Sequence, residues 1–305
     1  MIQVTFLGTS AALPTVDRNV AGLMMQREGE LFLFDCGEGT QRQLMRYGTG
    51  FTFEDIFFSH YHSDHTLGLP GLLRSLGMMA RTAPLRLYGP RGAHKHLGQL
   101  VALGMERVKF PIEIVEVDPG QRISRGEFDF HVGEASHRGD CVAYALVEHD
   151  RLGRFDPELA RSLGVPEGPL WGRIHKGEAI TLESGRVVAA TELVGAARPG
   201  RRVTYSGDSA PTDAMLHLAV GADLLIHEAT FGEDERERAR ETMHSTAREA
   251  ATLAFEAGAH RLVLTHISAR YSREAPELLA EARAVFDATS IARDGMVVEV
   301  PFRSA

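Results

Sequence analysis

Residues 60–65 read His60-Tyr61-His62-Ser63-Asp64-His65, and this short segment is the most informative part of the chain. It follows the apolar run Ile56–Phe58, which is typical of a strand, and it precedes an amphipathic stretch. Imidazole and carboxylate groups are ligands that zinc and manganese accept. Residues i and i+2 of an extended segment face the same way, so His60 and His62 can reach one ion. Asp64 and His65 can then reach a second ion, and the alternative is a hydrated cluster of surface histidines.

Three more candidate ligands lie outside this segment, each shortly after a strand-like run. They are His137, Asp208 and His266. Taken alone, each of them would be interpreted as a structural or surface residue. Binding sites in layered folds collect at the ends of strands. The three positions and residues 60–65 therefore predict a metal site assembled from several strands.

Short apolar runs alternate with amphipathic stretches along most of the chain. Their β-branched and aromatic residues and their Gly or Pro boundaries indicate strands. Strands are expected at Gln3–Leu7, Leu31–Phe34, Ile56–Phe58, Leu85–Tyr88, Ile112–Val117, Val142–Val147, Val203–Tyr205, Leu224–Ile226, Arg261–Leu264 and Met296–Val300. Helices are expected at Leu67–Met79, Ala93–Leu103, Thr212–Val220, Ser245–Ala257 and Ala275–Ala288. Strands that pair locally at first and then alternate with helices predict an α/β fold, a mixed sheet sandwich with helices on its outer faces.

Residues 151–200 depart from this pattern because Gly and Pro interrupt them repeatedly. Asp156 at an N-cap, Pro157 at the first helical position and Gly164 at the stop predict one short helix. The remainder is interpreted as a loop-rich excursion, and long loops of this kind are usually functional or disordered. The segment from Arg151 to Arg202 contains nine Lys/Arg and six Asp/Glu residues. Its net charge is therefore +3, in a chain whose net charge is −8.

The composition is that of an ordinary globular protein, with 44% hydrophobic and 24% charged residues. Negative net charge argues against a broadly basic surface for nucleic acid, although the average can hide a local patch. Cys36 and Cys141 are too few for a disulfide framework, which predicts two free thiols and a cytoplasmic location. No apolar run approaches the ~20 residues that span a bilayer, and the first residues lack the features of a signal peptide.

The candidate ligands occur in the same order as the metal motifs of the metallo-β-lactamase superfamily, which this chain resembles. Four further segments are similar to motifs of the ribonuclease Z family within that superfamily. They are Phe6-Leu7-Gly8-Thr9-Ser10-Ala11-Ala12-Leu13-Pro14-Thr15, Phe34-Asp35-Cys36-Gly37-Glu38-Gly39-Thr40-Gln41, Gly68-Leu69-Pro70-Gly71-Leu72-Leu73 and His227-Glu228-Ala229-Thr230-Phe231. The resemblance covers nearly the whole chain.

The resemblance implies a metallo-β-lactamase αββα sandwich, a single domain over residues 1–305 into which residues 151–200 are inserted as a tRNA-binding arm. It also implies two divalent metal ions, zinc or alternatively manganese. One ion would be bound by His60, His62 and His137, the other by Asp64, His65 and His266, with Asp208 bridging the pair. Asp35 matches a position that supports the ligands from behind, although it would serve equally well as a cap in a tight turn.

By the same resemblance, the chain is an endoribonuclease that removes 3′ trailers from precursor tRNA and leaves a 3′-hydroxyl on the tRNA. Two metal ions would activate the attacking water and offset charge on the phosphate. Asp64 would accept a proton, and His244, oriented by Glu228, would donate one to the leaving oxygen. Without the resemblance, His244 would be interpreted as a surface residue at the start of a helix.

Residues Gly168-Pro169-Leu170-Trp171-Gly172-Arg173-Ile174 resemble the Gly-Pro motif of the arm with which ribonuclease Z grips the tRNA body. A positive balance and the only tryptophan of the chain suit contact with the phosphate and sugar backbone. Family members of this short type are homodimers, in which the arm of one subunit can hold a tRNA that the other cuts. The alternative is that the excursion is a mobile insertion or a dimer strap.

Two other functions fit part of the sequence. Another hydrolase of the same fold, acting on a small substrate, would not need the Gly168-Pro169 arm. A non-catalytic RNA-binding protein would tolerate the loss of metal ligands, yet all seven candidate ligands are present. Cleavage of precursor tRNA is therefore the main prediction.

Overall fold

The structure, a computed structural model, describes residues 1–105, 107–271 and 274–303. These residues form two compact units. The first, called the core unit here, consists of Met1–Val147 and Arg202–Pro301. The second, called the arm unit, consists of Glu148–Arg201 together with residues 302–303. The excursion expected at residues 151–200 lies within the arm unit.

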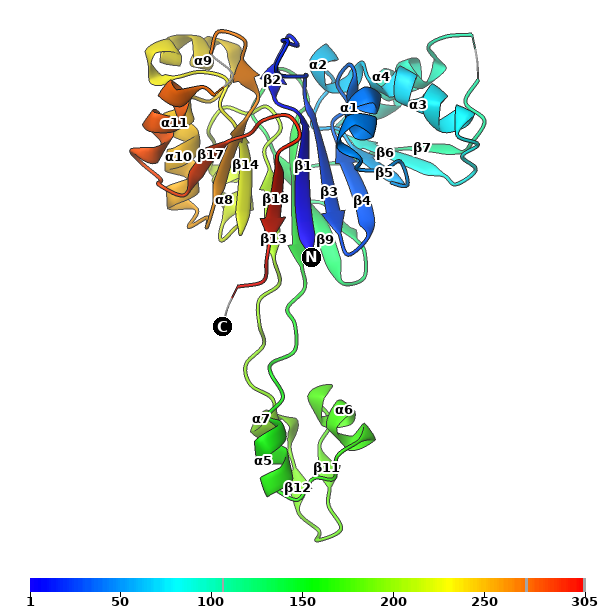
Figure 1. Cartoon of the computed structure of the whole chain (residues 1–305), viewed down its shortest axis with the longest axis vertical. Coiled ribbons are helices and arrows are strands. Elements are labelled where there is room, and N and C mark those ends of the chain that lie inside the picture. The colour runs from blue at the N-terminus through cyan, green and yellow to red at the C-terminus, as the bar shows by residue number, and fades with distance from the viewer. Residues whose placement is uncertain (106, 272–273, 304–305) are drawn as a thin grey trace. The chain divides into compact units, whose positions relative to one another are not determined.

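Within the described ranges, two seven-stranded sheets form the middle of the core unit (Figure 1). The strand order in the first sheet is β18 (Val297–Val300), β1 (Ile2–Gly8), β3 (Gly22–Arg27), β4 (Glu30–Phe34), β5 (Asp55–Phe57), β6 (Leu85–Gly89) and β7 (Ile112–Glu116). In the second it is β17 (Thr289–Ile291), β15 (Leu262–Thr265), β14 (Leu224–Glu228), β13 (Arg202–Tyr205), β10 (Val142–Glu148), β9 (Phe128–Glu134) and β8 (Arg122–Ser124). Both sheets are mixed: β1 runs antiparallel to β3, whereas β4 runs parallel to β5. A small parallel pair joins β2 (Ser10–Ala11) to β16 (Ile267–Ser268).

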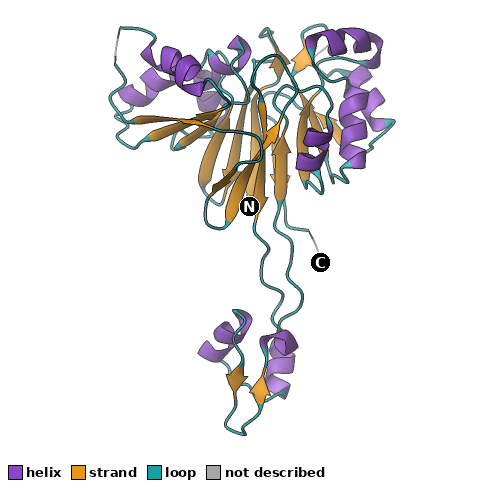
Figure 2. Cartoon of the chain, turned by 180° about the vertical axis from the view of Figure 1, so that it is seen from behind, coloured by secondary structure: helices purple, strands orange, loops and turns teal. Residues whose placement is uncertain are grey.

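Helices cover the outer face of each sheet, so the core unit is an αββα sandwich (Figures 1 and 2). The first sheet is covered by α1 (Thr40–Tyr47), α3 (Leu69–Met78) and α4 (Ala93–Ala102). The second is covered by α8 (Asp213–Ala219), α10 (Ala247–Glu256) and α11 (Pro276–Arg283). The short helices α2 (Ser63–Thr66) and α9 (Arg236–Thr242) complete the unit, and η1 (Glu233–Glu235) leads into α9.

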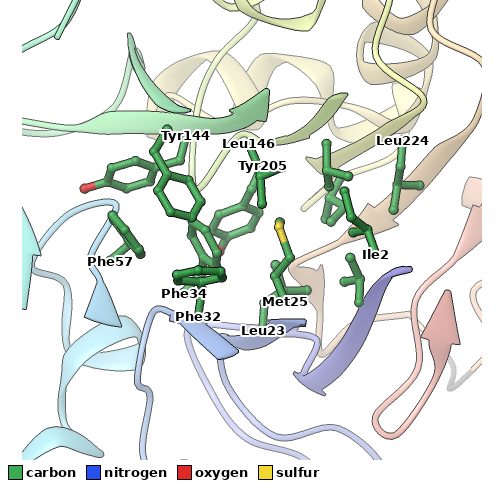
Figure 3. Packing of buried hydrophobic residues seen from close by; sticks show 14 of the residues in the cluster. Ile2, Leu23, Met25, Phe32, Phe34, Phe57, Tyr144, Leu146, Tyr205 and Leu224 are labelled. Atoms are coloured by element: carbon green, nitrogen blue, oxygen red, sulfur yellow. The ribbon is translucent and has the colours of Figure 1, made fainter. Parts of the chain in front are cut away.

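The alternation of side chains along each strand divides the apolar residues between layers. On β5 and just after it, Phe57 faces the other sheet, whereas Ile56 and Phe58 face the helices. Between the sheets, Phe57 stacks on Phe34 with ring centroids 5.1 Å apart, and Tyr144 packs edge-on against both (Figure 3). This aromatic packing fixes the spacing of the two sheets.

The ten predicted strands and five predicted helices of the core unit are all present, most with ends that differ by one or two residues. The helix predicted at Ala275–Ala288 ends at Arg283, because the chain must turn before it pairs with β15 as strand β17. Strands β3, β8 and β17 and helices α1 and α9 were not among the elements expected from the sequence. Strand β3 reads GLMMQR, without a β-branched or aromatic residue, and α1 reads TQRQLMRY, with few apolar positions.

The arm unit contains α5 (Pro157–Ser162), α6 (Pro169–His175), β11 (Ile180–Thr181), β12 (Val187–Val188) and α7 (Ala190–Leu193). Its buried hydrophobic residues are Ala160, Val165, Ile174, Ile180, Val188 and Leu193. Asp156 caps α5 by accepting a hydrogen bond from the backbone N–H of Leu159, as predicted. The unit contains more helices and strands than its Gly and Pro content predicts. These elements have two to seven residues each, which is too short to show a periodicity in the sequence.

Trp171 packs in this small core. Its ring centroid lies 5.2 Å from that of Phe155, and its indole N–H donates to the backbone oxygen of Val165 at 3.3 Å. Large aromatic side chains bury much apolar surface, and a core of this size has few other sources. Trp171 therefore has a packing role in the arm unit that was not expected from the sequence, and its contact with RNA stays a prediction.

Cys36 and Cys141 are unpaired and buried, in agreement with the prediction of two free thiols. Burial raises the pKa of each thiol to about 12, so both are protonated at neutral pH. In the part of the chain that the structure describes, no helix is long and apolar enough to cross a membrane.

Candidate metal centre

The seven predicted ligands come together in the core unit. His60 and His62 follow β5, Asp64 and His65 lie in α2, and His137, Asp208 and His266 follow β9, β13 and β15. Their donor atoms form two groups, His60 with His62, His137 and Asp208, and Asp64 with His65 and His266. Within each group the atoms lie within 4.8 Å of one another.

Glycines beside this segment allow an unusually close approach of backbone to backbone. The N–H of Gly68 donates to the oxygen of Cys36 at 2.8 Å, and the N–H of Cys36 donates to the oxygen of His65 at 2.7 Å. A β-carbon on Gly68 would lie 2.0 Å from the backbone oxygen of Gly37, so a larger residue would push α2 away. Two of the motifs quoted above thus hold the His/Asp segment in place.

Each of four histidines has a hydrogen-bond partner on its Nδ1 atom. The partners are Ser59 Oγ for His60 (3.0 Å), Asp35 Oδ2 for His65 (2.9 Å), the Met243 carbonyl oxygen for His137 (2.9 Å) and Thr230 Oγ1 for His266 (2.9 Å). Partners that accept from Nδ1 fix the tautomer in which Nε2 carries the lone pair. The four Nε2 atoms can therefore bind a cation.

The same four Nε2 atoms converge on Asp208. Its Oδ2 atom lies 3.3 Å from His266, 3.4 Å from His65, 3.7 Å from His60 and 3.8 Å from His137. Its Oδ1 atom is buried without a hydrogen-bond partner among the described residues, which is costly unless a cation is bound nearby. Burial alone would raise the pKa of Asp208, but the imidazoles of His266 and His65 outweigh it and hold the pKa well below its usual range. Asp208 is therefore an ionised carboxylate that faces both groups.

The spacing of the donor atoms fits shared metal ions. His62 Nδ1 lies 3.0 Å from His60 Nε2 and 3.2 Å from His137 Nε2. His266 Nε2 lies 3.3 Å from His65 Nε2 and 3.3 Å from Asp64 Oδ2. Nitrogen and oxygen ligands that bind one tetrahedral ion at about 2.0–2.1 Å are separated from each other by roughly 3.3 Å. The residues present thus fit divalent metal ions.

Four residues other than glycine adopt left-handed backbone conformations at this site. They are Ala12 (φ 59°), whose N–H donates to Asp64 Oδ2 at 2.9 Å, Asp35 (φ 53°), Met243 (φ 58°) and His266 (φ 55°). Such conformations cost about 1–3 kcal/mol each and concentrate at functional sites. Here the strain directs ligands, because Asp35 holds the ring of His65, the carbonyl of Met243 holds that of His137, and His266 is itself a donor.

Glu228 and His244 form a pair beside the donor groups. Glu228 Oε1 lies 2.7 Å from His244 Nδ1, and the carboxylate also accepts hydrogen bonds from Ser209 N and Thr230 Oγ1. Burial alone would lower the pKa of His244, but the charge of Glu228 outweighs it and raises the pKa to about 9. His244 could also join Asp208 and His266 as a third donor group. His65 also has a carboxylate on Nδ1, that of Asp35, but its side chain is fully buried, whereas His244 is partly exposed and lines the cleft.

A cleft of about 660 Å³ opens over the donor atoms. Its lining includes Asp64, Asp208, His244 and three cationic side chains, Arg138, Arg238 and Arg270. The guanidinium groups of Arg238 and Arg270 lie 5.8 and 6.0 Å from the ring centroid of Phe231. Arg238 and Arg270 also pair with Glu235, at 3.9 and 3.5 Å, so the cleft combines arginines that suit an anionic substrate with nearby carboxylates.

Several supporting residues were not predicted from the sequence. Ser59 orients His60, Thr230 orients His266, and the Tyr205 hydroxyl donates to Asp35 Oδ2 at 2.7 Å. Thr230 lies within the quoted segment 227–231, which could have suggested it. Ser59 and Tyr205 carry no signal in the sequence, because their role depends on how the two sheets face each other.

Comparisons with known proteins agree with this site. A family described as anti-Pycsar protein Apyc1 matches residues 2–150, and one described as a β-lactamase superfamily domain matches residues 175–267. Ribonuclease Z of Gemmatimonas aurantiaca is 56% identical over 302 residues, which are 98% of this chain and 96% of that protein. Ribonuclease Z of Myxococcus xanthus is 52% identical over 304 residues, 99% of each chain. The crystal structure of human tRNase Z, short form, has a TM-score of 0.69 at 28% identity and covers 98% of this chain and 100% of that chain.

The fold and the two donor groups define a metal-dependent hydrolase of the metallo-β-lactamase class. Within this class, the chain is 56% and 52% identical over nearly its full length to two proteins named ribonuclease Z. It belongs to the ribonuclease Z family.

Proposed function

We propose that the protein is an endoribonuclease that removes the 3′ trailer from precursor tRNA and leaves a 3′-hydroxyl on the tRNA. The observation that carries this proposal is the complete set of seven donors in a chain 56% identical to a ribonuclease Z. Full-length similarity to a human tRNase Z supports tRNA as the substrate.

We assign one metal ion to His60, His62 and His137, the other to Asp64, His65 and His266, and the position between them to Asp208. When bound, the two ions supply a Lewis acid that activates water and stabilises negative charge on the phosphate. Zinc is the proposed metal, because tetrahedral sets of ligands rich in imidazole suit it. Metal analysis of the purified protein distinguishes zinc from manganese, the alternative.

Proton transfer is assigned to two residues of the chain. Asp64 borders the cleft and would accept the proton of the attacking water, although His65 and His266 lower its pKa against the effect of burial and make it a weak base. His244 would donate a proton to the ribose 3′-oxygen as it leaves. Bound cations oppose protonation of His244, and the carboxylate of Glu228 favours it. Glu228 is therefore a positioning residue that also keeps His244 charged.

The arm unit is proposed to bind the tRNA body and to take no part in the chemistry. Residues 148–201 hold eight Lys/Arg and eight Asp/Glu residues, so the argument rests on individual cations, of which Arg154 and Lys176 are exposed. A-form RNA is recognised largely through its phosphate and sugar groups, for which exposed cations are suitable partners. We propose residues 151–200 as an insertion in an otherwise single domain.

A homodimer in the cytoplasm completes the proposal. Met78 and Met79 at the end of α3 and Leu103 and Met105 after α4 are exposed large apolar side chains. Helices α3 and α4 contact each other, and exposed apolar side chains on neighbouring elements favour an interface between protein chains. Sedimentation equilibrium tests this, since a monomer at micromolar concentration would contradict it.

The decisive experiment uses purified protein, a 3′-extended precursor tRNA and mapping of both product ends. Cleavage after the mature tRNA end with a 3′-hydroxyl supports the proposal, and cleavage elsewhere or none contradicts it. A variant in which a short Gly/Ser linker replaces residues 157–193 tests the role of the arm unit. It should lose activity on precursor tRNA while hydrolysis of bis(p-nitrophenyl) phosphate continues. Unchanged processing by this variant would exclude the arm from substrate binding.

A further inference from the structure

Phe302 of the arm unit lies between two arginines. The guanidinium carbon of Arg151 is 3.4 Å from the centroid of the Phe302 ring, and that of Arg201 is 3.8 Å from it. Two guanidinium groups so close to one centroid would overlap on a single face, so they lie on opposite faces. The ring face is the negative end of the aromatic quadrupole and attracts both cations.

The two arginines belong to the two chain segments that begin and end residues 148–201 of the arm unit. Backbone hydrogen bonds join these segments, from Glu148 N to Arg201 O at 2.9 Å and from Arg151 N to Arg198 O at 2.8 Å. We call the segments Glu148–Arg151 and Arg198–Arg201 the stem. Phe302 comes from a third segment, distant in sequence, and contacts one arginine of each half of the stem.

Arg201 is fixed in place. Its side chain is 2% exposed, and it donates to both carboxylate oxygens of Glu148, at 2.8 and 2.7 Å, from Nε and Nη2. A bidentate arrangement of this kind sets the orientation of the guanidinium plane. Arg201 thus presents a rigid face to the ring.

Arg151 is held less firmly. Burial and the like charge of Arg198 lower its pKa, and its Nε atom has no hydrogen-bond partner among the described residues. Like charges in the stem repel one another. An aromatic ring inserted between Arg151 and Arg201 separates the two cations and attracts both, so its removal should loosen the stem at Arg151.

We propose that Phe302 is a positioning residue for the arm, which orders the stem by cation–π contacts on both ring faces and so prepares the arm unit for RNA. This inference rests on the proposed tRNA-binding role of the arm unit. A pre-ordered stem loses less conformational freedom when RNA binds, which strengthens binding without a contact between Phe302 and the RNA.

The test compares three substitutions of Phe302 in the full chain, with kinetics on precursor tRNA and on bis(p-nitrophenyl) phosphate. Phe302→Ala should raise KM for precursor tRNA by roughly five- to thirtyfold, the worth of two cation–π contacts, with kcat unchanged. Phe302→Leu should behave like Phe302→Ala, because it keeps apolar volume and lacks the quadrupole. Phe302→Tyr should restore the parental KM. Phe255, an exposed phenylalanine of α10, provides the matched control, and Phe255→Ala should change nothing.

Hydrogen exchange gives a readout that does not depend on catalysis. The amides of Arg151 and Arg198 should exchange faster in Phe302→Ala than in the parent. Equal KM values for Phe302→Ala and the parent, or full rescue by Phe302→Leu, would overturn the inference.

The variant that lacks residues 157–193 separates the inference from the proposed function. If that variant processes precursor tRNA normally, the arm proposal fails and the inference fails with it. If that variant is impaired and Phe302→Ala is not, the inference alone fails.

Discussion

The core unit and the arm unit bury apolar side chains on very different scales. Three hydrophobic clusters fill the core unit, between its sheets and under its helices, whereas one cluster with six buried hydrophobic residues holds the arm unit. The arm unit adds exposed ion pairs, such as Arg173 with Glu178, which contribute about 0–1 kcal/mol each. Deep packing holds metal ligands at fixed spacing, whereas contact with phosphates requires only that cations be presented. Changes at the metal donors of the core unit should therefore alter all activities, and changes in the arm unit should alter only those on tRNA.

The largest effect is expected from Asp208→Ala. Loss of the carboxylate removes the group that faces both donor sets, so bound metal and activity on both substrates should fall together to background. Metal content by mass spectrometry and both assays check this. Asp213→Ala, a change of an exposed carboxylate in α8, serves as the control and should leave both unchanged. Full metal content and normal turnover in Asp208→Ala would refute the role of Asp208.

His244→Ala should separate the substrates by leaving group. Loss of a general acid typically slows a reaction by about 10²–10⁴-fold, and this loss should appear in kcat for precursor tRNA. A nitrophenolate leaves without a proton, so hydrolysis of bis(p-nitrophenyl) phosphate should suffer far less. Bound metal should stay at the parental level. Equal losses on both substrates would identify His244 as a metal-supporting residue, in line with its proximity to Asp208 and His266.

Asp35→Asn tests whether the carboxylate of Asp35, which contacts Nδ1 of His65, strengthens metal binding. The amide keeps the shape of the side chain but removes the charge that faces His65, so metal affinity should fall by roughly 10–100-fold. Competition with a chromophoric chelator measures this. Activity at saturating metal should recover most of its parental value. Unchanged metal affinity would reduce Asp35 to a turn residue.

The smallest effect is expected from single cations of the arm unit. Lys176→Ala or Arg154→Ala should reduce the slope of log affinity for precursor tRNA against log salt by roughly 0.7–0.9 per lost phosphate contact. Hydrolysis of bis(p-nitrophenyl) phosphate should not change. Lys95→Ala, on α4 of the core unit, is the matched control. A slope that stays the same in all arm variants would mean that the arm unit does not touch phosphate.

Much of the core unit could be predicted from the sequence, because its signals are local. The apolar runs that form β1, β5 and β15 are continuous. Residues 60–65 contain four donors within six residues. The ends of strands could also be predicted. His137, Asp208 and His266 were proposed as ligands because they follow strand-like runs, and the structure brings them together with residues 60–65. The pairing of Glu228 with His244 followed from the family resemblance rather than from the residues.

The remainder depends on contacts between distant segments. Ser59 and Tyr205 reach Asp35 from opposite sheets, and no pattern along the chain announces this. The small core of the arm unit gave no periodic signal, so Trp171 was assigned to RNA instead of to packing. The contact of Phe302 with Arg151 and Arg201 joins residues more than a hundred positions apart.

The metal donors come from both sheets of the sandwich. His60 and His62 follow a strand of the first sheet, whereas His137, Asp208 and His266 follow strands of the second. An ion can be fully coordinated only after the sheets have come together, so metal binding and folding are thermodynamically linked. Free ion at about 100 times its Kd would add roughly 2.7 kcal/mol per site to the free energy of unfolding. The amount of folded protein, and not only its activity, should therefore follow the supply of metal in the cell.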